Sequence, residues 1–332
     1  MYENILATAA NTPLVKLKQV FGDLPFNLFA KLEAFNPGGS LKDRPAFDII
    51  RKGLARGDFA PGATIIESSS GNMGIGLAQA CGYFGLRFIC VVDQKTTTQN
   101  VKLLKAYGAE IDLVDEPDPS TGEFLQARLN RVRHLLATHE NSFWPNQYSN
   151  LDNPAAHYRT MREITYELDR KVDYLFCATS TCGTARGCAE FISDHELSTR
   201  LIAVDAVGSV LFSGQPGKRL IPGHGAGVVS ELYRSEIAER CVRVNDLDCV
   251  IGCRRLLMKE SIMAGGSSGA VLSAFAQVKD EIPDGSNCVL IFADRGERYL
   301  DTIYSDEWVE ENFGEVSHLW KETSALEVEP AY

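Results

Sequence analysis

The sequence predicts an α/β protein with two lobes, each a mostly parallel twisted sheet between two layers of helices. Strand-like and helix-like segments alternate from about residue 62, and the same alternation returns in the second half of the chain. The chain has 332 residues and is 45% hydrophobic, which is enough apolar material for a large core. Because repeated βα units need crossover helices, we expect parallel strands covered by helices.

The first half contains a run of βα units. The segment "FNPGGSLKDRPAFDIIRKG" (35–53) reads as a tight turn, an N-cap at Ser40 and a helix over 41–53. Three apolar strands follow it, and they alternate with helices that end near a glycine or a polar turn. We expect the strands at 64–68, 87–93 and 110–115, and the helices at 71–85, 98–108 and 122–139.

The second half repeats this pattern after a helix at 153–171. We expect strands at 173–179, 200–206, 241–246 and 287–294, and helices at 184–195, 248–261 and 268–281. A glycine-rich crossover precedes the strand at 241–246. We place a smaller, mobile lobe at 40–146, a larger lobe at 10–39 and 147–314, and a tail of weak periodicity at 315–332. A cleft is expected between the lobes.

Composition disfavours several classes of protein. The net charge is −11 and no dense Lys/Arg block occurs, so nucleic-acid binding is not expected. The longest apolar runs have the length of strands, which predicts no membrane span, and the N-terminus has no basic and apolar leader. A cytoplasmic protein follows from this, and its nine cysteines then read as mostly buried thiols. Their spacing and that of the histidines favour no metal site.

Lys42 occupies an unusual position for a cation. It lies in the first turn of the helix predicted at 41–53, where the helix dipole disfavours an ammonium group. The dipole and burial in a cleft would both favour the neutral amine, which can attack an aldehyde and later take up a proton. An exposed first-turn lysine is the alternative, and the local sequence leaves both interpretations open.

Three polar turns open predicted helices, and the first two of them also follow predicted strands. They are "ESSSGNMG" (67–74), "TSTCGTARG" (179–187) and "AGGSSGAV" (264–271). Helix N-termini bind anions, and ligands of open α/β sheets bind at the carboxyl ends of the strands. Each turn alone is weak evidence, and no GxGxxG or P-loop motif occurs. Together with a helix-start lysine, they suit a phosphorylated aldehyde cofactor, for which pyridoxal 5'-phosphate is the obvious candidate.

"NPGGSLKDRPA" resembles the cofactor-lysine motif of the cysteine synthase and cystathionine β-synthase family, which is pyridoxal-phosphate fold type II. The likeness spans nearly the whole chain in the family's order, through "NTPLVKL", "ESSSGNMG", "NQYSNLDNP", "STCGT", "GHGAG", "GGSSGA" and "DRGERYL". It implies a fold like the β-subunit of tryptophan synthase, a homodimer, and β-replacement on a serine derivative through a Lys42 Schiff base and an aminoacrylate.

The resemblance also implies roles for individual residues. Lys42 would be the catalytic residue and Asn72 would bind the cofactor's ring oxygen, while Ser267 would face the pyridine nitrogen. The phosphate group would be held by Ser180, Thr181, Cys182, Gly183 and Thr184. The substrates would be bound by Ser69, Ser70, Gly71, Met73, Gln147, Tyr148, Arg128 and, again, Ser180.

Several residues depart from the sulfide-using members of the family. Met73 replaces a small hydroxyl residue, Ser180 and Cys182 replace glycines, His224 replaces an aliphatic residue, and Arg295 replaces a small one. With these changes the sequence resembles a branch of the family that joins O-phospho-L-serine to L-glutamate. The product, N-(2-amino-2-carboxyethyl)-L-glutamate, is a precursor of 2,3-diaminopropionate for siderophores and antibiotics.

Alternatives remain open at this point. Arg128 could clamp an anionic substrate, but a solvated helix arginine is the commoner case. Tyr148 and Ser180 could orient substrates or merely pack and cap, and His224 could be a loop histidine without a catalytic role. The enzyme could be a cysteine synthase using O-acetylserine or O-phosphoserine with sulfide, or a cystathionine β-synthase-like enzyme. A non-catalytic ligand sensor on the same fold is a more distant possibility.

Overall fold

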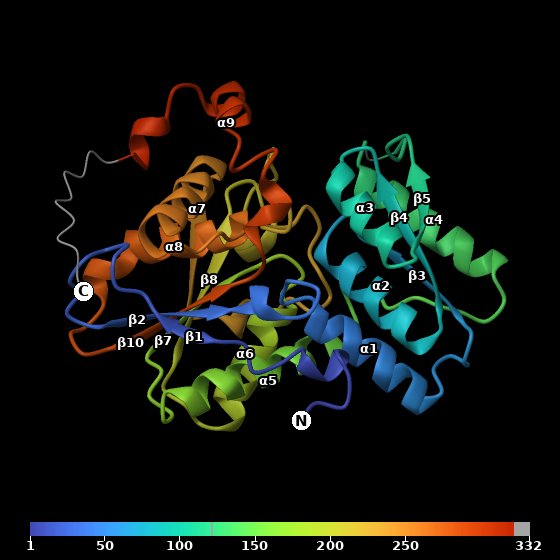
Figure 1. Ribbon diagram of the computed structural model, residues 1–332, viewed down its shortest axis with the longest axis horizontal. Helices are drawn as coiled ribbons and strands as arrows, with labels where there is room; N and C mark the ends of the chain where they lie inside the picture. Colours follow the sequence, from blue (N-terminus) through green and yellow to red (C-terminus); the bar gives the residue numbers. More distant parts are fainter. Residues whose placement is uncertain (121, 322–332) are drawn as a thin grey trace.

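A computed structural model describes residues 1–120 and 122–321 of the chain. Within them the strands form two separate sheets (Figure 1). The larger sheet has the order β1-β2-β10-β7-β8-β9, and the smaller has the order β5-β4-β3-β6. The predicted α/β class with mostly parallel sheets is therefore confirmed. The boundaries proposed for the two lobes stay a prediction.

The larger sheet is parallel except at one edge. Its strands are β1 (Leu14–Lys16), β2 (Asn27–Leu32), β7 (Tyr174–Ala178), β8 (Arg200–Ala206), β9 (Arg240–Val244) and β10 (Asn287–Phe292). Only β1 pairs antiparallel, with β2. Strand β10 is central and pairs with β2 on one side and β7 on the other, so that the last long strand of the chain lies beside the first.

The smaller sheet is entirely parallel in its described pairings. It consists of β3 (Thr64–Ser68), β4 (Arg87–Asp93), β5 (Glu110–Val114) and the two-residue strand β6 (Ser142–Phe143). β3 is buried along its whole length and β4 at all but its first residue, because helices cover both faces of this sheet and successive side chains of a strand point to opposite faces. Ile65 packs with the core under α1 (Asp43–Arg56) and α2 (Asn72–Phe84), whereas Ile66 packs under α4 (Phe124–Thr138).

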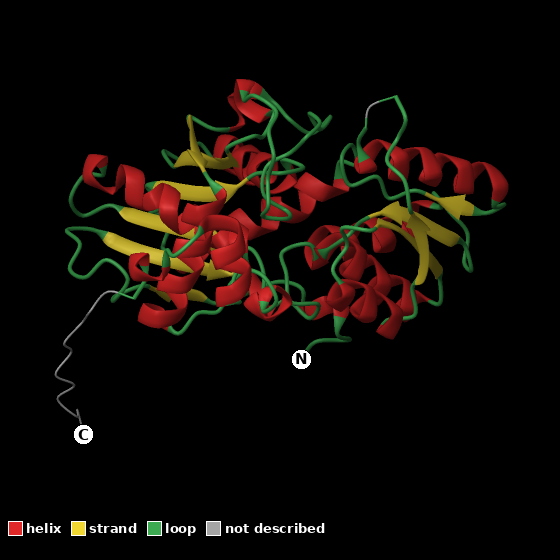
Figure 2. Ribbon diagram, turned by 90° about the horizontal axis from the view of Figure 1, so that it is seen from above, coloured by secondary structure: helices red, strands yellow, loops and turns green. Residues whose placement is uncertain are grey.

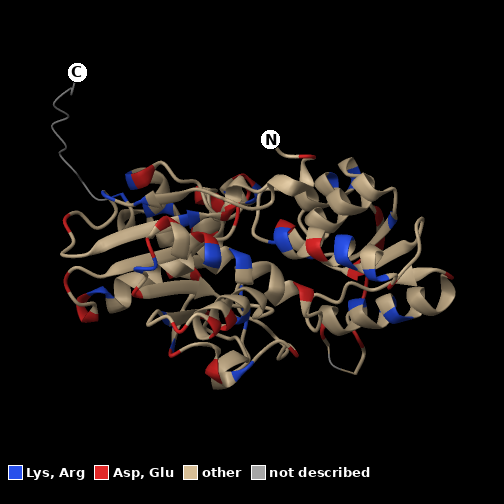
Figure 3. Cartoon of the chain, turned by 90° about the horizontal axis from the view of Figure 1, so that it is seen from below, with Lys and Arg blue, Asp and Glu red and all other residues tan. Residues whose placement is uncertain are grey.

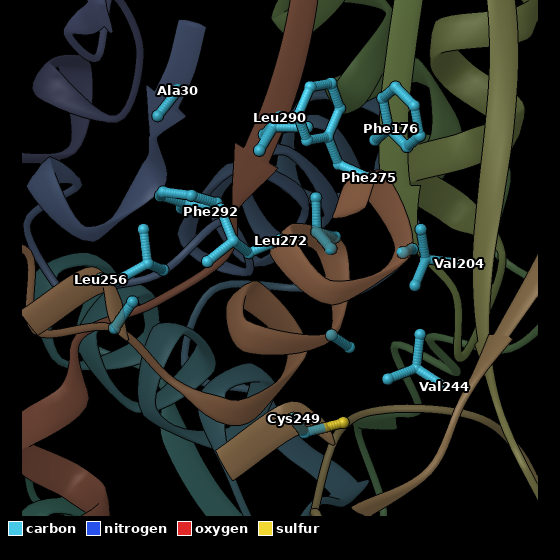
Figure 4. Packing of buried hydrophobic residues seen from close by; sticks show 14 of the residues in the cluster. Ala30, Phe176, Val204, Val244, Cys249, Leu256, Leu272, Phe275, Leu290 and Phe292 are labelled. Atoms are coloured by element: carbon cyan, nitrogen blue, oxygen red, sulfur yellow. The ribbon is translucent and has the colours of Figure 1, made fainter. Parts of the chain in front are cut away.

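Helices cover both faces of the larger sheet as well (Figure 1), and Figure 2, a view turned by 90°, shows the strands of the two sheets in yellow as two separate groups. Helices α7 (Asp246–Glu260) and α8 (Gly266–Val278) lie on one face, and α5 (Asp152–Glu167) and α6 (Gly183–Asp194) on the other. In the core beneath α8, Phe275 packs edge-on to Phe176 at a centroid distance of 5.5 Å (Figure 4). The remaining helices are α3 (Thr98–Ala106) and α9 (Asp306–Phe313), with short 3₁₀ turns between elements.

A buried ion cluster anchors helix α1, the helix that begins beside Lys42. Arg44 is fully buried and donates from Nε to Glu33 at 2.6 Å and from Nη1 to Glu163 of α5 at 2.7 Å. Lys31 of β2 is also fully buried and lies 3.1 Å from Glu163. Burial of these charges is tolerated because each has opposite charge and hydrogen bonds around it. The cluster fixes the start of α1 against the larger sheet.

Three expectations about individual segments need correction or addition. Ser40 is not the helix N-cap: α1 begins at Asp43, and Lys42 is its N-cap residue. Strand β2 and helix α9 were not predicted, although Ser305 caps α9 by accepting the Trp308 N–H. The described part of the tail is packed, since Trp320 is buried in the core of the larger sheet. Residues 322–332 of that tail lie outside the described residues.

The distribution of charged residues and the burial of the cysteines agree with what the composition predicts. Basic and acidic residues are interspersed over both sheets and their helices (Figure 3). Eight of the nine cysteines are buried and all nine are free thiols. In the described part of the chain, no helix has both the length and the apolar character needed to cross a membrane. Across the same residues, no cluster of three or more His, Cys, Asp or Glu side chains is arranged for a metal ion.

Candidate active site

A cleft of about 960 Å³ lies at the carboxyl ends of strands from both sheets. It is lined where β3, β4, β7 and β10 end, at Ser68, Asp93, Ala178 and Ala293, and by the loop that follows β8. This edge is where open α/β sheets bind their ligands. Every site residue predicted from the sequence lines the cleft except Gly183, which begins α6 between the lining residues Cys182 and Thr184.

Lys42 reaches the cleft from the N-terminus of α1. Its side chain is half-buried, and among the described residues its Nζ donates no hydrogen bond and forms no ion pair. Burial lowers the pKa of the Lys42 ammonium, although Cys177, Cys182 and Asp294 nearby act in the opposite direction. An amine with a lowered pKa and no partner is available to bond an aldehyde carbon.

The loop after β3 forms one wall of the cleft and begins helix α2. The Ser69 hydroxyl accepts the N–H of Gly74 at 2.8 Å and thereby closes the first turn of the helix. Ser70 and Gly71 line the cleft beside it. Met73 has only 2% of its surface exposed and belongs to the core between α1 and α2. Because it also lines the cleft, its side chain limits the space beside this core.

Glu67 ties this loop to the opposite segment at 144–148, and sequence reasoning overlooked it. Its carboxylate accepts the N–H of Ser68 at 2.8 Å, the indole N–H of Trp144 at 3.0 Å and the N–H of Gln147 at 3.2 Å. Full burial raises the pKa of Glu67 to about 7, against the effect of these donors. The carboxylate thus positions both walls, including Gln147, without lining the cleft itself.

The turn after β7 forms an anion cradle at the start of α6. Cys182 adopts left-handed backbone angles, with φ of 65°, just before the helix. This conformation turns successive N–H groups toward one point, and the first-turn N–H groups of a helix have no acceptor within the helix. A Cβ added at Gly183 would lie 2.2 Å from Oδ1 of Asn153, so only glycine fits. Thr181 and Thr184 add hydroxyl groups at the same edge.

The floor of the cleft is formed by Asp294 and its partners. Asp294 accepts the side-chain N–H of Asn72 at 2.7 Å and the Tyr299 hydroxyl at 2.5 Å, and burial raises its pKa. Arg298 donates to the Asn72 carbonyl oxygen and to the backbone oxygen of Gly38. Ser267, in the first turn of α8, is buried and also lines the floor.

Two arginines of the motif "DRGERYL" have different positions. Arg298 lines the cleft, whereas Arg295 is exposed and does not line it, since its Nε donates to the backbone oxygen of Ala34 at 2.9 Å. The departure at Arg295 therefore does not change the lining of the cleft. The sequence analysis did not single out Arg298. It lies in the same motif as Arg295, three residues later, and this position was the signal available in the sequence.

A second group of polar residues lies on the far side from the cradle. Arg128 of α4 has 12% of its side chain exposed, and its Nε lies 3.2 Å from the Asp93 carboxylate. Tyr148 is half-buried, and burial raises its pKa. Ser180 is half-buried and lines the same cleft. The structure brings Arg128, Tyr148 and Ser180 to one cleft, so Arg128 is not simply a solvated helix arginine.

His224 is buried in the loop after β8 and lines the cleft. Only 1% of its surface is exposed, and neither ring nitrogen has a partner among the described residues. Burial, with a contribution from nearby Arg219, lowers the pKa of His224 to about 4. The imidazole is therefore neutral near neutral pH, with one N–H and one lone pair unused.

These features fit pyridoxal phosphate. The Lys42 amine, which has no partner among the described residues, lines one cleft with a helix-terminal cradle for a phosphate and the buried Ser267 hydroxyl. This cleft lies at the edge of two mostly parallel sheets. Together they define a pyridoxal-phosphate dependent enzyme of α/β architecture. The family model described as "Pyridoxal-phosphate dependent enzyme" matches residues 5–294, and the chain belongs to that family.

Individual relatives show which members of the family the chain resembles. The chain is 46% identical over 308 residues to an N-(2-amino-2-carboxyethyl)-L-glutamate synthase of Ralstonia nicotianae, covering 92% of this chain and 91% of that protein. It is 45% identical to a protein of the same name from Cupriavidus metallidurans, with the same coverage. The crystal structure of O-acetylserine sulfhydrylase isoform 3 from Entamoeba histolytica superposes with a TM-score of 0.85 at 34% identity, over 92% of each chain.

Proposed function

We propose that the protein joins O-phospho-L-serine to L-glutamate by β-replacement, giving N-(2-amino-2-carboxyethyl)-L-glutamate and phosphate. The observation that supports this most is the similarity to the two synthases of that name over nine-tenths of the chain. The cleft agrees with it chemically. Beyond Lys42 and the cradle it contains further cations, including Arg128, Lys218 and Arg219, which suit a phosphorylated ester and a dicarboxylate better than sulfide.

The proposed roles follow from position. Bound pyridoxal phosphate supplies the electron sink that makes the α-proton of the serine ester acidic and lets its β-substituent leave. Lys42 Nζ would hold the cofactor and would take up and return that proton. Asn72 and Ser267, which line the same cleft, would bind the ring. The phosphate is held at the start of α6 by Ser180, Thr181, Cys182, Gly183 and Thr184.

The substrate groups meet the opposite walls. Ser69, Ser70 and Gly71 offer hydroxyl and N–H groups to the α-carboxylate of the serine ester, with Gln147 behind them. Met73 limits the space there. Arg128 and Tyr148 face the same region, where Asp93 already holds part of the guanidinium charge. In this arrangement Arg128 recognises an anionic group of a substrate through its remaining N–H donors.

A competition assay tests the proposal. Cofactor-loaded protein is mixed with O-phosphoserine, glutamate and sulfide together, and the products are read by mass spectrometry. If the proposed function is correct, the products are the glutamate adduct and one phosphate per adduct. Cysteine as the sole product would identify a cysteine synthase instead, and no product from any pair would favour a ligand sensor. The same assay with O-acetylserine identifies the preferred leaving group.

We further propose a homodimer in the cytoplasm, on the resemblance to fold type II enzymes. Light scattering on the purified, cofactor-loaded chain gives the mass directly. A mass of one chain under assay conditions contradicts the dimer.

A further inference from the structure

We infer that Arg219 and His224 form the binding site for the distal carboxylate of the nucleophile, and that they select an amino dicarboxylic acid. This inference rests on the proposed function and adds a specificity site to it. Both residues belong to the crossover between β8 and β9, a segment from which no substrate role was predicted. Both line the cleft.

The crossover lies at the same sheet edge as the phosphate cradle. Gly225 N–H donates to the backbone oxygen of Thr179 at 2.8 Å, just before the cradle begins. The 224–227 turn is thus fixed beside the cofactor site rather than at the rim of the cleft. A ligand that extends from the reacting carbon past the cradle reaches this turn next.

Arg219 is a guanidinium with spare hydrogen-bonding capacity. Its Nε is buried without a partner, and it forms no ion pair with a carboxylate among residues 1–120 and 122–321. Its one bond is a long contact of 3.4 Å from Nη1 to the backbone oxygen of His224. Gly225 and Gly227 leave room for it, since a Cβ at either would lie 3.2 or 3.3 Å from the guanidinium nitrogens. Planar donors left open in this way match a carboxylate.

His224 supplies the second half of the site. An unpartnered buried imidazole is unfavourable, and such groups usually find a partner in a ligand or a water. Being neutral, His224 offers one N–H donor without adding a second positive charge. One cation and one neutral donor together match the single negative charge of a carboxylate. Sulfide has no planar pair of oxygens and would gain little from either residue.

The other cations of the cleft are already engaged or exposed. Arg128 is paired with Asp93, and Arg298 is bound to Asn72 and Gly38. Lys95 and Lys218 are exposed, and Lys95 lies over the Phe124 ring at 5.1 Å. Among the described residues, Arg219 is the cleft arginine that has neither a carboxylate partner nor a short hydrogen bond. Its charge is what the second carboxylate of glutamate would complement.

The test compares Arg219→Gln and His224→Leu with Arg234→Gln as the matched control. Arg234 is exposed on the same crossover, and its guanidinium donates to the backbone oxygens of Glu231 and Tyr233. Initial rates are measured with varied glutamate and with varied O-phosphoserine. We expect KM for glutamate to rise roughly ten- to hundredfold in Arg219→Gln, as for loss of a charge-assisted hydrogen bond. The kcat and the KM for O-phosphoserine should change by less than about threefold.

Two further measurements separate the possible outcomes. L-norvaline, which lacks the distal carboxylate, should react equally poorly with wild type and Arg219→Gln. Calorimetric titration of the cofactor-loaded protein with glutarate should show binding that Arg219→Gln abolishes and Arg219→Lys partly restores. An unchanged KM for glutamate, or a rise in KM for O-phosphoserine instead, overturns the inference. If the wild type makes no adduct but binds glutarate through Arg219, the proposed function is wrong, while the carboxylate site at Arg219 and His224 stands.

Discussion

The side-chain amide of Asn72 donates a 2.7 Å hydrogen bond to Asp294, across 222 positions of sequence. Asn72 begins α2 above the smaller sheet, and Asp294 follows β10 at the centre of the larger one. Arg298 donates to the other end of the same amide. One side chain therefore links both sheets directly beside Lys42, at the position expected to contact the cofactor ring.

Replacing Asn72 with alanine should weaken both stability and cofactor binding. The variant removes one donor from the buried Asp294 carboxylate and one acceptor from Arg298, which costs about 1–3 kcal/mol of unfolding free energy. Urea denaturation of the apoprotein measures this loss, and equilibrium dialysis measures the cofactor. Asn312→Ala is the control, because its exposed amide only contacts Trp308 O within α9 and should stay within about 0.5 kcal/mol. Equal losses in both variants would refute the linking role.

Lys42→Ala should abolish covalent attachment of the cofactor. Borohydride reduction of the cofactor-loaded wild type fixes the cofactor on a peptide containing Lys42, and the variant should yield no such peptide by mass spectrometry. Turnover should fall by about 10²- to 10⁴-fold or below detection, as for loss of a proton-transferring group. Lys52→Ala on the same helix, where Lys52 pairs with Asp48 and Asp152, should retain attachment. A labelled peptide from any other lysine contradicts the assignment.

Gly183→Ala should distort the cradle. The new Cβ would meet Asn153 Oδ1 at 2.2 Å, and Asn153 would then lose its 2.8 Å bond to the backbone oxygen of Gln147. We expect a loss of about 1–3 kcal/mol in unfolding free energy and weaker binding of pyridoxal phosphate. In Gly82→Ala, the nearest atom lies 3.6 Å away, so this helix-interior change should stabilise by about 0.5–1 kcal/mol. Thermal melts with and without cofactor check both, and a fully tolerated Gly183→Ala would count against the cradle.

Local sequence patterns predicted the fold and much of the cleft because each predicted turn lies next to its own strand. The turns at 67–74, 179–187 and 264–271 needed only the strand before or the helix after them to be recognised. Parallel strands then brought their carboxyl ends together. Strand β2 was harder to predict, because a 3₁₀ turn at Glu33–Phe35 and the loop after it separate this strand from helix α1.

Residues that act through distant partners could not be found in this way. Glu67 reads as the end of an apolar strand, and its role depends on Trp144 and Gln147, which are 77 and 80 positions away. Arg298 and Asp294 meet Asn72 only through the order of strands in two sheets. His224 was noted as a departure, but whether its ring nitrogens find partners depends on how the crossover folds back toward the cradle.

His224 should make the protein sensitive to acid. Its pKa is about 4 in the folded chain against 6.5 for an ordinary histidine, so the unfolded chain binds the proton more readily. The stability that the neutral imidazole contributes is fully present above pH 6.5 and is lost as the pH falls toward 4. For a shift of this size the full effect is about 3 kcal/mol. Unfolding free energy should therefore fall less steeply with acid in His224→Leu than in wild type.

Urea titrations at pH 7.5, 6.0 and 4.5 measure the difference between the two proteins. Other buried groups also contribute to the pH dependence, including His157, whose pKa burial lowers well below its usual value. Only the change in the gap between wild type and variant therefore reports on His224. The gap should move in favour of the variant as the pH falls. Parallel curves would mean that the His224 imidazole gains a proton as easily when folded as when unfolded, and that it is not buried without a partner.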